Sequence, residues 1–391
     1  MKIQFFLFSG NIQMAGVFKK ELNKISLLKN LGSDCEGVLF TNQDTYVLNN
    51  YIKIKSIKLN TTLNLIQRIK RARYIAHVIG NEIKNLGNKD CILLRYPYHI
   101  FYYPKNILKK HRRCKVIFEH NTKEIDEFKL LSGYFSQIFL QELFLGGFIR
   151  SQADAIVGVT DEITQYQLKR CHDPRKPHIT IGNGFDVASA PIRHPPTYNT
   201  TTHHLLFVAN VSHWHGIDRL IRGLASYDGE TGIILHVAGE GAELPNLKKL
   251  VKDYGLTENV IFHGFVTGQP LDELFNTCHI AVGSLGIHRK GLTQTSELKV
   301  REYCARGIPW IIACRDPDFP DDFPYIHRIP ADESPVNIEE IIEFAKRICN
   351  DPDHPQKMRE YALDHLDWSI KMKRLKEFLE DLVHESSPGV S

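Results

Sequence analysis

The feature that most constrains the fold of this chain is a repeated alternation of short apolar runs with stretches of helical spacing. Residues 3–8, 91–97 and 115–120 have the length and composition of buried strands, and residues 17–31 show the helical spacing most clearly. This order predicts an α/β fold in which parallel sheets are covered by helices on both faces. The alternation stops at a proline-containing segment without periodicity, residues 186–204, and then resumes.

The interruption divides the chain into two similar halves. We expect an N-terminal doubly wound domain over residues 1–185, a linker over 186–204 and a C-terminal doubly wound domain over 205–365. A length of 391 residues fits two domains of ordinary size. Sheets of this type bind ligands at the carboxyl ends of their strands, so the sequence predicts a ligand cleft there. His203 and His204, near the end of the linker, are expected to be solvated loop residues.

The charge is unevenly distributed between the two halves. Residues 1–150 contain 24 Lys+Arg and 11 Asp+Glu, whereas the rest of the chain contains 25 and 34. The excess of positive charge predicts an anionic partner for the first half. The basic runs at 68–73 and 109–115 lack the aromatic motifs of RNA-binding domains, so nucleic acid is disfavoured and an anionic membrane surface is favoured. A lysine-rich solvated surface is the alternative.

Composition also limits the cellular locations that we expect for the protein. No stretch reaches the roughly 18–20 apolar residues that span a bilayer, and residues 1–14 suit a first strand better than a signal peptide. The eight cysteines form no CxxC pair, which argues against a zinc or redox site and favours reduced core thiols. We therefore expect a cytoplasmic protein, peripheral on the inner face of the membrane if the basic half binds lipid.

The most informative segment is SELKVREYCARGIPWI at residues 296–311. Small polar residues, among them Ser296, precede a predicted helix whose N-terminal amides suit a diphosphate. Lys299 lies one turn into the helix and Glu302 follows on the same face, so the lysine is placed to neutralise phosphate and the carboxylate to accept hydrogen bonds from ribose. A capped surface helix with an ordinary Lys/Glu pair would show the same spacing.

With its REYCARGIP ending, this segment resembles part of the donor-site signature of retaining family-4 glycosyltransferases (glycosyl transferases group 1). That family has the GT-B fold, in which two Rossmann-like domains face each other across a cleft. Its signature contains two glutamates separated by seven residues, followed by a Gly/Pro turn. Glu302 matches the second glutamate, which binds ribose, and Gly307 and Pro309 match the turn. The position of the first glutamate holds Gln294.

The resemblance extends over nearly the whole chain and is strongest at residues 205–312. LLFVANVSHWHGIDRLI resembles the opening strand, phosphate loop and helix of the family's second domain, and HVAGEGAELPNLKKL and NVIFHGFV resemble the next two strands and their loops. KVIFEHN places His120 where the family has a histidine near the donor sugar. DWSIKMKRLKEFLEDL resembles the terminal helix that crosses back onto the first domain, here at about 366–391.

The chain departs from the family pattern in its phosphate loop. The family's phosphate-binding Arg and Lys fall at Asn210 and His215, which are weaker partners for an anion. We expect Lys299, Arg289 or Lys290 to supply the missing positive charge.

The resemblance implies a full set of site residues. The catalytic candidates are His120, Lys299 and Glu302. The candidates for donor binding are Gly16, Asn210, His215, Gly239, Gly264, Gln294, Ser296 and Leu298. No metal or cofactor is expected beyond a UDP- or GDP-sugar as donor substrate. The Asp-Pro-Asp triplets that begin at Asp316 and Asp351 resemble an Asp-x-Asp metal motif, but they occur in proline-rich turns, where aspartate is common.

The implied function is retaining transfer of a hexose from a nucleotide diphosphate sugar to a hydroxyl of a glycan or lipid-linked acceptor, in surface polysaccharide or glycolipid biosynthesis. Two alternatives stay open. Because of the substitutions at Asn210, His215 and Gln294, one alternative function is that of a non-catalytic GT-B partner of another glycosyltransferase. A nucleotide-sugar epimerase or a phosphorylase would also use this fold, although the acid/base residues of the former and the cofactor lysine of the latter are not recognisable.

Overall fold

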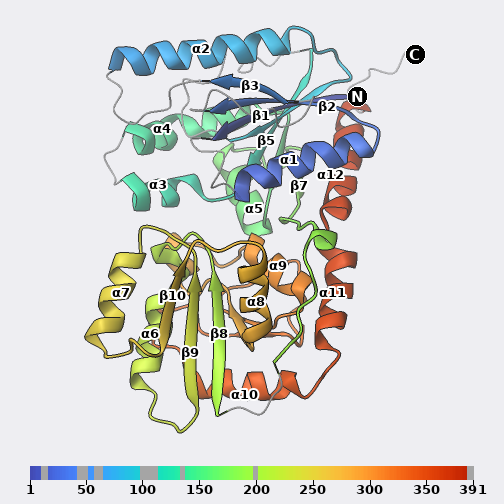
Figure 1. Cartoon of the computed structure of the whole chain (residues 1–391). Coiled ribbons are helices and arrows are strands. Elements are labelled where there is room, and N and C mark those ends of the chain that lie inside the picture. Colours follow the sequence, from blue (N-terminus) through green and yellow to red (C-terminus); the bar gives the residue numbers. More distant parts are fainter. Residues whose placement is uncertain are drawn as a thin grey trace. The chain divides into compact units, whose positions relative to one another are not determined.

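A computed structural model shows two compact α/β units (Figure 1). The structure describes residues 1–9, 16–41, 52–56, 65–96, 113–132, 137–196 and 201–384. Unit 1 combines residues 1–182 with the C-terminal segment 368–391, and unit 2 comprises residues 183–367. The chain therefore leaves the first unit once and returns to it at its end.

Unit 1 is built on a parallel sheet whose order among the described strands is β3-β2-β1-β4-β5-β6-β7. The strands are β1 (Lys2–Ser9), β2 (Asp34–Thr41), β3 (Ile52–Ser56), β4 (Cys91–Arg95), β5 (Lys115–His120), β6 (Ala155–Gly158) and β7 (His178–Thr180). The first three strands progress toward one edge, and β4 then starts a progression toward the other. The order thus reverses between β1 and β4, as in doubly wound folds.

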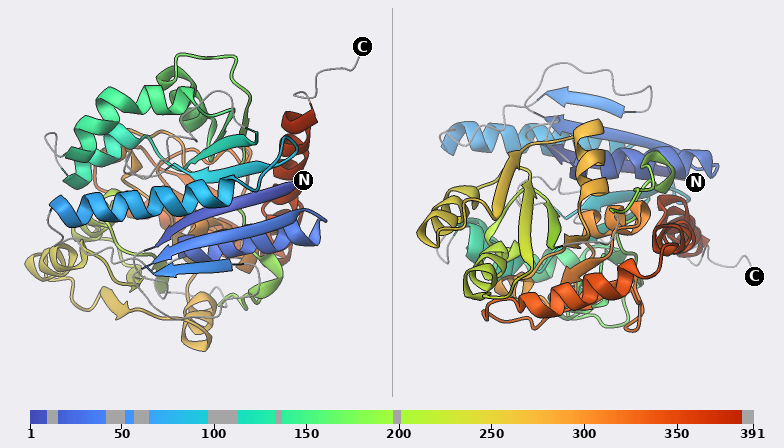
Figure 2. Two further views of the ribbon diagram at one scale, coloured as in Figure 1. Left: turned by 90° about the horizontal axis from the view of Figure 1, so that it is seen from above. Right: turned by 60° about the horizontal axis from the view of Figure 1, so that its bottom comes forward.

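Helices cover both faces of this sheet, as Figure 2 shows from two further directions. They are α1 (Gly16–Asn30), α2 (Leu65–Ile83), α3 (Glu124–Ser132), α4 (Gln137–Ser151), α5 (Asp161–Arg170) and α12 (Trp368–His384). The terminal helix α12 packs against α1. Helix α1 ends before Gly32, which adopts a φ of 85° as a C-terminal glycine commonly does.

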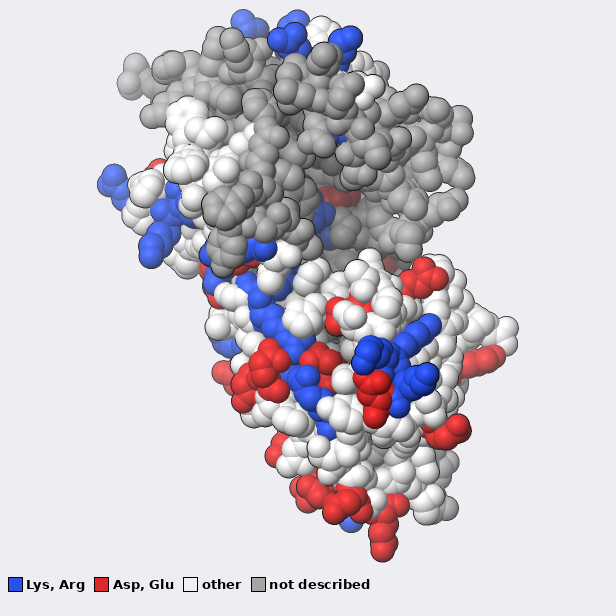
Figure 3. Space-filling view, turned by 90° about the vertical axis from the view of Figure 1, so that its left-hand side faces the viewer, with Lys and Arg blue, Asp and Glu red and all other residues white. Residues whose placement is uncertain are grey.

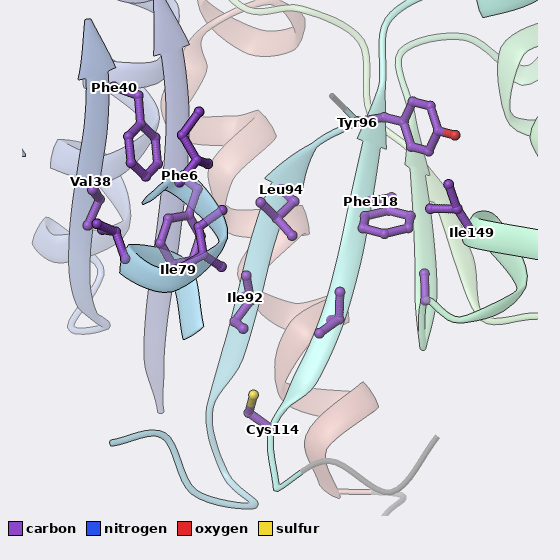
Figure 4. Packing of buried hydrophobic residues seen from close by; sticks show 14 of the residues in the cluster. Phe6, Val38, Phe40, Ile79, Ile92, Leu94, Tyr96, Cys114, Phe118 and Ile149 are labelled. Atoms are coloured by element: carbon purple, nitrogen blue, oxygen red, sulfur yellow. The ribbon is translucent and has the colours of Figure 1, made fainter. Parts of the chain in front are cut away.

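The core of unit 1 explains why its strands are continuously apolar. Phe6, Val38, Leu94 and Phe118 come from four neighbouring strands and pack on one face, where α2 contributes Ile79 (Figure 4). The residues between them on the strands are also buried, because helices cover the second face as well: Phe5, Leu39, Leu93 and Ile117. A strand enclosed on both sides has no solvent face and needs no polar alternation.

Unit 2 repeats the architecture with the strand order β10-β9-β8-β11-β12-β13, again parallel. Its strands are β8 (Thr202–Val208), β9 (Gly232–Ala238), β10 (Val260–Gly264), β11 (Ile280–Val282), β12 (Trp310–Ile312) and β13 (Ile326–Arg328). The order reverses between β8 and β11. The loops that follow these two strands therefore diverge from a single point at the carboxyl edge of the sheet.

The helices of unit 2 include three single 3₁₀ turns. The α-helices are α6 (Ile217–Ser226), α7 (Leu244–Asp253), α8 (Gln269–Thr277), α9 (Leu298–Arg306), α10 (Ile338–Cys349) and α11 (His354–His365), and the turns are η2 (Val187–Ser189), η3 (His213–His215) and η4 (Ile287–Lys290). Helix α9 ends at Gly307, which has a φ of 81°. A Cβ there would lie 2.4 Å from the Cα of Pro355, so this glycine lets α11 approach closely.

One expectation about local structure differs from what is observed. Strand β8 begins at Thr202, within the segment expected to be a linker, so His203 and His204 belong to a strand, and His203 is buried rather than solvated. The polar side chains hid the strand pattern, although an imidazole has an apolar body that can be buried. The C-terminal segment forms two helices, α11 and α12, which are separated at Leu366 and Asp367.

Charge follows the division into units. Unit 1 contains 32 Lys+Arg and 19 Asp+Glu, whereas unit 2 contains 17 and 26. In Figure 3, basic side chains gather at the top of the view, at the height where Figure 1 places α2. All eight cysteines are free thiols. Seven of them are buried, and Cys349 is partly exposed.

A row of histidines crosses the sheet of unit 2. The Nδ1 of His204 lies 2.9 Å from the Nε2 of His236, and the Nδ1 of His236 lies 2.9 Å from the Nε2 of His263. The backbone amide of His204 also donates to the Nδ1 of His279 at 3.0 Å. Burial and neighbouring imidazoles lower the pKa of His236 and of His279 to about 4, so both rings are neutral at neutral pH.

This row predicts a loss of stability in mild acid. Because these imidazoles bind protons more weakly in the folded than in the unfolded chain, their stabilising contribution is complete above pH ~6.5 and declines toward pH ~4. We expect the thermal unfolding midpoint to fall by several degrees over this interval, and to fall less in His236→Gln. Calorimetry of His384→Gln, which changes an exposed histidine, provides the control. An equal decline in wild type and His236→Gln would contradict the prediction.

Candidate functional site

The loops at the carboxyl edge of the unit 2 sheet are joined by direct backbone hydrogen bonds. The amide of Val211, after β8, donates to the carbonyl of Glu240, after β9, at 2.6 Å. The amide of Leu285, after β11, donates to the carbonyl of His215 at 2.8 Å. These bonds hold together the loops around the point where the strand order reverses, which is where open α/β sheets bind ligands.

Glycines allow these loops to touch. Gly239 has a φ of 136°, and a Cβ there would lie 1.8 Å from the carbonyl oxygen of Ala209. Gly216 has a φ of 66°, and its Cβ would lie 2.5 Å from the amide nitrogen of Gly286. A side chain at either position would therefore meet backbone and separate the loops. Gly264, at the end of β10, also has a positive φ, 67°, but faces open space.

His215 lies at the centre of this loop cluster. Its Nδ1 accepts a hydrogen bond from the backbone amide of Ser212 at 3.0 Å, so the neutral ring carries its proton on Nε2. Burial, together with the charges of Lys299 and Lys290, lowers the pKa of His215 well below its usual range. The imidazole is therefore a neutral hydrogen-bond donor at physiological pH.

Two lysines accompany this histidine. Lys299, in the first turn of α9, places its Nζ 3.1 Å from the Oγ of Ser284 and 2.6 Å from a carboxylate oxygen of Glu297, and it also lies over the ring of Phe207. The Nζ of Lys290 lies 4.9 Å from the ring centroid of Trp214, the residue before His215. Positive charge thus surrounds the position where the resembling family has its phosphate-binding residues.

Arg289, the third cation considered for this role, is held elsewhere. Its guanidinium binds both carboxylate oxygens of Asp218, at 2.8 and 2.9 Å, and both of Glu333, at 2.8 and 2.6 Å. It also donates to the carbonyl of His213. These contacts occupy every N–H group of the side chain, so Arg289 joins η3, η4 and α6 and leaves Lys299 and Lys290 as the cations beside His215.

The segment before α9 is anchored on both sides. The hydroxyl of Ser296 accepts a hydrogen bond from the amide of Asn183 at 2.7 Å, which ties the segment after β7 to the start of the helix. Gln294 forms a parallel bridge with Arg315. Leu298 is the first residue of α9, and its amide belongs to the unpaired group at the helix N-terminus. Ser296, Gln294 and Leu298 therefore define the path of the chain into the helix.

Glu302 lies one turn beyond Lys299 on α9. Its Oε1 accepts a hydrogen bond from the Nε of Arg306 at 2.9 Å, and Arg306 also binds Asp272 at 2.7 Å. Within the ranges that the structure describes, Oε2 has no partner. This oxygen is partly accessible and suits a hydroxyl donor such as ribose. Asn210, after β8, is exposed, in agreement with a loop position.

His120 belongs to unit 1, at the end of β5, and has a network of its own. Its Nδ1 lies 2.6 Å from the Oε1 of Glu124, and the Oε2 of Glu124 accepts a hydrogen bond from Arg150 at 2.8 Å. Arg150 also binds Glu142 at 2.6 Å, and the ring of Tyr96 stacks against His120. Every member of this network is buried.

The protonation of His120 follows from these contacts. Burial lowers the pKa of His120, so the ring is neutral at neutral pH. Although burial alone would raise the pKa of Glu124, its contacts with His120 and Arg150 lower it, so this carboxylate is ionised and can only accept. The proton of His120 therefore lies on Nδ1, and Nε2 is a hydrogen-bond acceptor. Nε2 is buried and has no hydrogen-bond partner among the residues that the structure describes.

Glu119, the residue before His120, points to the opposite face of the sheet. Its carboxylate binds Lys20 at 3.1 Å and also Lys24, both on α1. Lys20 additionally donates to the side chain of Asn121 at 2.9 Å. The two lysines lower the pKa of Glu119 against the effect of burial, so this carboxylate is charged and fixes α1 to the end of β5.

The structure thus gathers part of the expected site in one place. His215, Lys299, Glu302, Ser296 and the neighbouring glycines surround the carboxyl edge of unit 2. Gly16, a candidate for donor binding, is the first residue of α1, and residues 10–15 before it lie outside the described residues.

Sequence reasoning missed Arg150, Ser284 and Glu297. Nothing in the sequence indicated a role for Ser284 and Glu297 apart from their proximity to the segment that resembles the donor-site signature. The charge of Arg150 within a strongly apolar helix was a visible signal for a buried pair.

The first Asp-Pro-Asp triplet has a structural partner. Asp316 and Asp318 both bind the guanidinium of Arg301, which is fully buried on α9. Arg301 in turn donates to the carbonyl of Asn183 at 3.0 Å. Among the residues that the structure describes, no group of three or more His, Cys, Asp or Glu side chains is arranged to hold a metal ion.

Comparison with known proteins bears on the fold. Residues 190–321 match the family model described as Glycosyl transferases group 1, which covers about a third of the chain. Solved structures similar to the chain include the sucrose-phosphate synthase of Thermosynechococcus elongatus, with 15% identity and a TM-score of 0.71 over 98% of this chain and 100% of that one. The chain has the GT-B fold.

Two further GT-B structures show a similar likeness. The lipopolysaccharide outer core galactosyltransferase WaaB is 16% identical with a TM-score of 0.66, over 97% of this chain and 99% of that one. HepE of Anabaena in complex with UDP-glucose is 14% identical with a TM-score of 0.66, over the same shares. A search of curated protein sequences found no match. No helix within the described ranges has both the length and the hydropathy needed to cross a bilayer.

The loop contact at Gly216 yields a stability test. Gly216→Ala places a Cβ 2.5 Å from backbone and also strains a left-handed residue, whereas Gly255→Ala, with a φ of 68° and open space, adds the strain alone. We expect Gly255→Ala to cost about 1 kcal/mol of unfolding free energy and Gly216→Ala clearly more. Urea denaturation measures both. Equal losses would show that the loop contact is not tight.

Proposed function

We propose that this GT-B protein is a retaining glycosyltransferase that moves a hexose from a nucleotide diphosphate sugar to a hydroxyl of a glycan or lipid-linked acceptor. The observation that carries the proposal is the grouping of His215, Lys299 and the start of α9 at the carboxyl edge of unit 2. A helix N-terminus, a neutral imidazole donor and an ammonium group together suit a diphosphate. The segment that matches Glycosyl transferases group 1 contains all three.

Each residue of this site has a proposed role. The backbone amides at the start of α9 and the Nε2–H of His215 bind phosphate oxygens, and Lys299 neutralises their charge. Glu302 accepts hydrogen bonds from ribose through its Oε2. Gly239 and Gly264 keep the neighbouring loops free of side chains where the nucleotide lies. This arrangement would replace the Arg/Lys pair of the resembling family by an imidazole and a lysine on a different element.

The same groups would assist bond cleavage. The leaving nucleoside diphosphate gains negative charge as its bond to the anomeric carbon breaks, and donors fixed in advance stabilise that charge without rearrangement. A phosphate oxygen of the leaving group would accept the proton of the acceptor on the face that the diphosphate leaves, which retains the anomeric configuration. No side chain of the protein is then required as a general base.

We assign His120 a separate role in hexose transfer. Its Nε2 is a buried acceptor that no described residue pairs with, and Glu124 fixes both the tautomer and the orientation of the ring. Such an atom suits a sugar hydroxyl, which would satisfy this acceptor. We further propose that the reaction serves surface polysaccharide or glycolipid biosynthesis at the inner face of a membrane, because unit 1 is strongly basic.

Replacing Lys299 tests the donor site. Lys299→Ala removes one of the two ammonium groups that act on His215, so we expect binding of UDP- or GDP-sugars to weaken about tenfold or more, which corresponds to one charge-assisted contact. Calorimetry with the nucleotide that stabilises the wild type in a thermal-shift screen measures the effect. Lys249→Ala, which changes an exposed lysine on α7, is the matched control. Unchanged affinity would remove Lys299 from the site.

Turnover separates the transferase from its alternatives. Wild-type protein that binds nucleotides but neither transfers nor hydrolyses their sugars would favour a non-catalytic partner. Release of an epimerised sugar would favour an epimerase.

Replacing His120 tests the second role. His120→Ala removes the buried acceptor, and we expect kcat for sugar transfer to fall by about two orders of magnitude while the Kd for the free nucleoside diphosphate changes little. Glu124→Gln leaves the ring in place but no longer fixes its proton on Nδ1. We therefore expect a loss of kcat intermediate between those of the wild type and His120→Ala. A fall in nucleotide affinity equal to the fall in kcat would place His120 in the nucleotide site instead.

A further inference from the structure

Helix α4 in unit 1 departs from the usual amphipathic pattern, although it does bury Phe139 and Ile149. Its charged residues, Glu142 and Arg150, face the interior and are buried. Its apolar residues, by contrast, include several of the most exposed large hydrophobic side chains among those described. A surface helix ordinarily buries its apolar stripe and exposes its charges. Helix α4 therefore needs a separate explanation for each of its two faces.

The inward face is explained by the network around His120. Arg150 donates to Glu124 at 2.8 Å and to the hydroxyl of Tyr96 at 3.0 Å, and it pairs with Glu142 at 2.6 Å. The Glu142–Arg150 pair passes over Gly146, where a Cβ would lie 2.3 Å from Glu142 and 2.6 Å from Arg150. The glycine therefore makes room for the ion pair along two turns of the helix.

The outward face carries no such polar partners. Leu140, Leu143, Phe144 and Phe148 follow the i, i+3, i+4, i+8 spacing of a single helical face. Their exposed fractions are 37%, 39%, 75% and 59%, which for two phenylalanines on one stripe is a large apolar area. Leu130 on the adjoining helix α3, 46% exposed, adds to it. Contiguous apolar area of this kind marks an interaction surface.

Positive charge accompanies this apolar face. The end of α5 meets α4 at Gly147 and presents Arg170, whose guanidinium contacts Glu142, and the exposed Lys169. Unit 1 as a whole has 32 basic and 19 acidic residues. In Figure 3, uncharged surface lies at the height of α4, with Lys and Arg atoms close by. An apolar strip on a basic unit complements an anionic bilayer, with its negative headgroups and hydrocarbon layer below.

We propose that the outward face of α4, with Phe144 and Phe148 at its centre, docks unit 1 on an anionic lipid surface. The two aromatic rings enter the boundary between headgroups and acyl chains, and Lys169 together with other exposed basic residues of unit 1 binds the headgroups. This proposal deepens the proposed function, on which it rests for a lipid-linked acceptor, by naming the face that meets the membrane. Because the inward face of the same helix holds Arg150 and Glu124, docking places the His120 network directly beneath the lipid surface.

Vesicle cosedimentation tests the docking face. The probe is phosphatidylcholine vesicles with and without phosphatidylglycerol, at low and high salt. We expect wild-type protein to bind the anionic vesicles at low salt, and Phe144→Ser/Phe148→Ser to bind about tenfold more weakly or worse. Tyr254→Ser/Leu363→Ser, which changes two exposed apolar residues of unit 2, should bind like the wild type. Phe144→Trp should show blue-shifted emission on anionic vesicles and none on neutral ones.

The outcomes are distinguishable. Absence of wild-type binding, or equal binding by the Phe144→Ser/Phe148→Ser variant, would overturn the proposal. The proposal would also be overturned if the wild type were a dimer and the Phe144→Ser/Phe148→Ser variant a monomer. The face would then join two copies of the chain. The Phe144→Trp variant keeps the test valid if the serine variant does not fold. Nucleotide affinity is measured on the same samples: vesicle binding without any nucleotide binding would reject the transferase and retain the docking face.

Discussion

The structure depends on the burial of the central strands of its two parallel sheets. Because helices cover both faces of these strands, most polar chemistry is confined to the loops at their ends, and the histidine row of unit 2 is an exception. The reversal of strand order between β8 and β11 then fixes which loops meet, and the glycines at 216 and 239 decide how closely. The grouping of His215 with Lys299 follows from this topology rather than from any local preference of the residues themselves.

The buried charges show how the protein tolerates exceptions to this exclusion. Arg150 and Arg301 are fully buried, and each is bound by two carboxylates and by further acceptors. Removing one partner from such a group leaves an uncompensated charge, which is far more destabilising than the pair is stabilising. Each arginine also joins segments distant in sequence: Arg150 connects α4 with α3 and Tyr96, and Arg301 connects α9 with the turn at Asn183.

Much of the fold was predictable from the sequence, because alternation of apolar runs and helical spacing is a local signal. The bounds of α1, β5 and α9 agree closely with the periodic segments. The start of β8 was not predictable, since His203 and His204 conceal a strand whose burial depends on neighbours from β9 and β11. The site was only partly predictable for the same reason. Lys299 and Glu302 belong to one helix, whereas the contact of Arg289 with Asp218 and Glu333 joins three separated segments.

The row of histidines in unit 2 has a consequence for proton order. In a neutral imidazole one nitrogen donates and the other accepts, so each hydrogen bond in the row must be donated by one ring and accepted by the next. If His204 donates from Nδ1, then Nε2 of His236 accepts, so His236 and in turn His263 carry their protons on Nδ1. If His263 instead donates from Nε2, all three rings are Nε2–H tautomers. The three rings therefore share one tautomeric state, and a change at either end of the row reverses the direction of all its hydrogen bonds together.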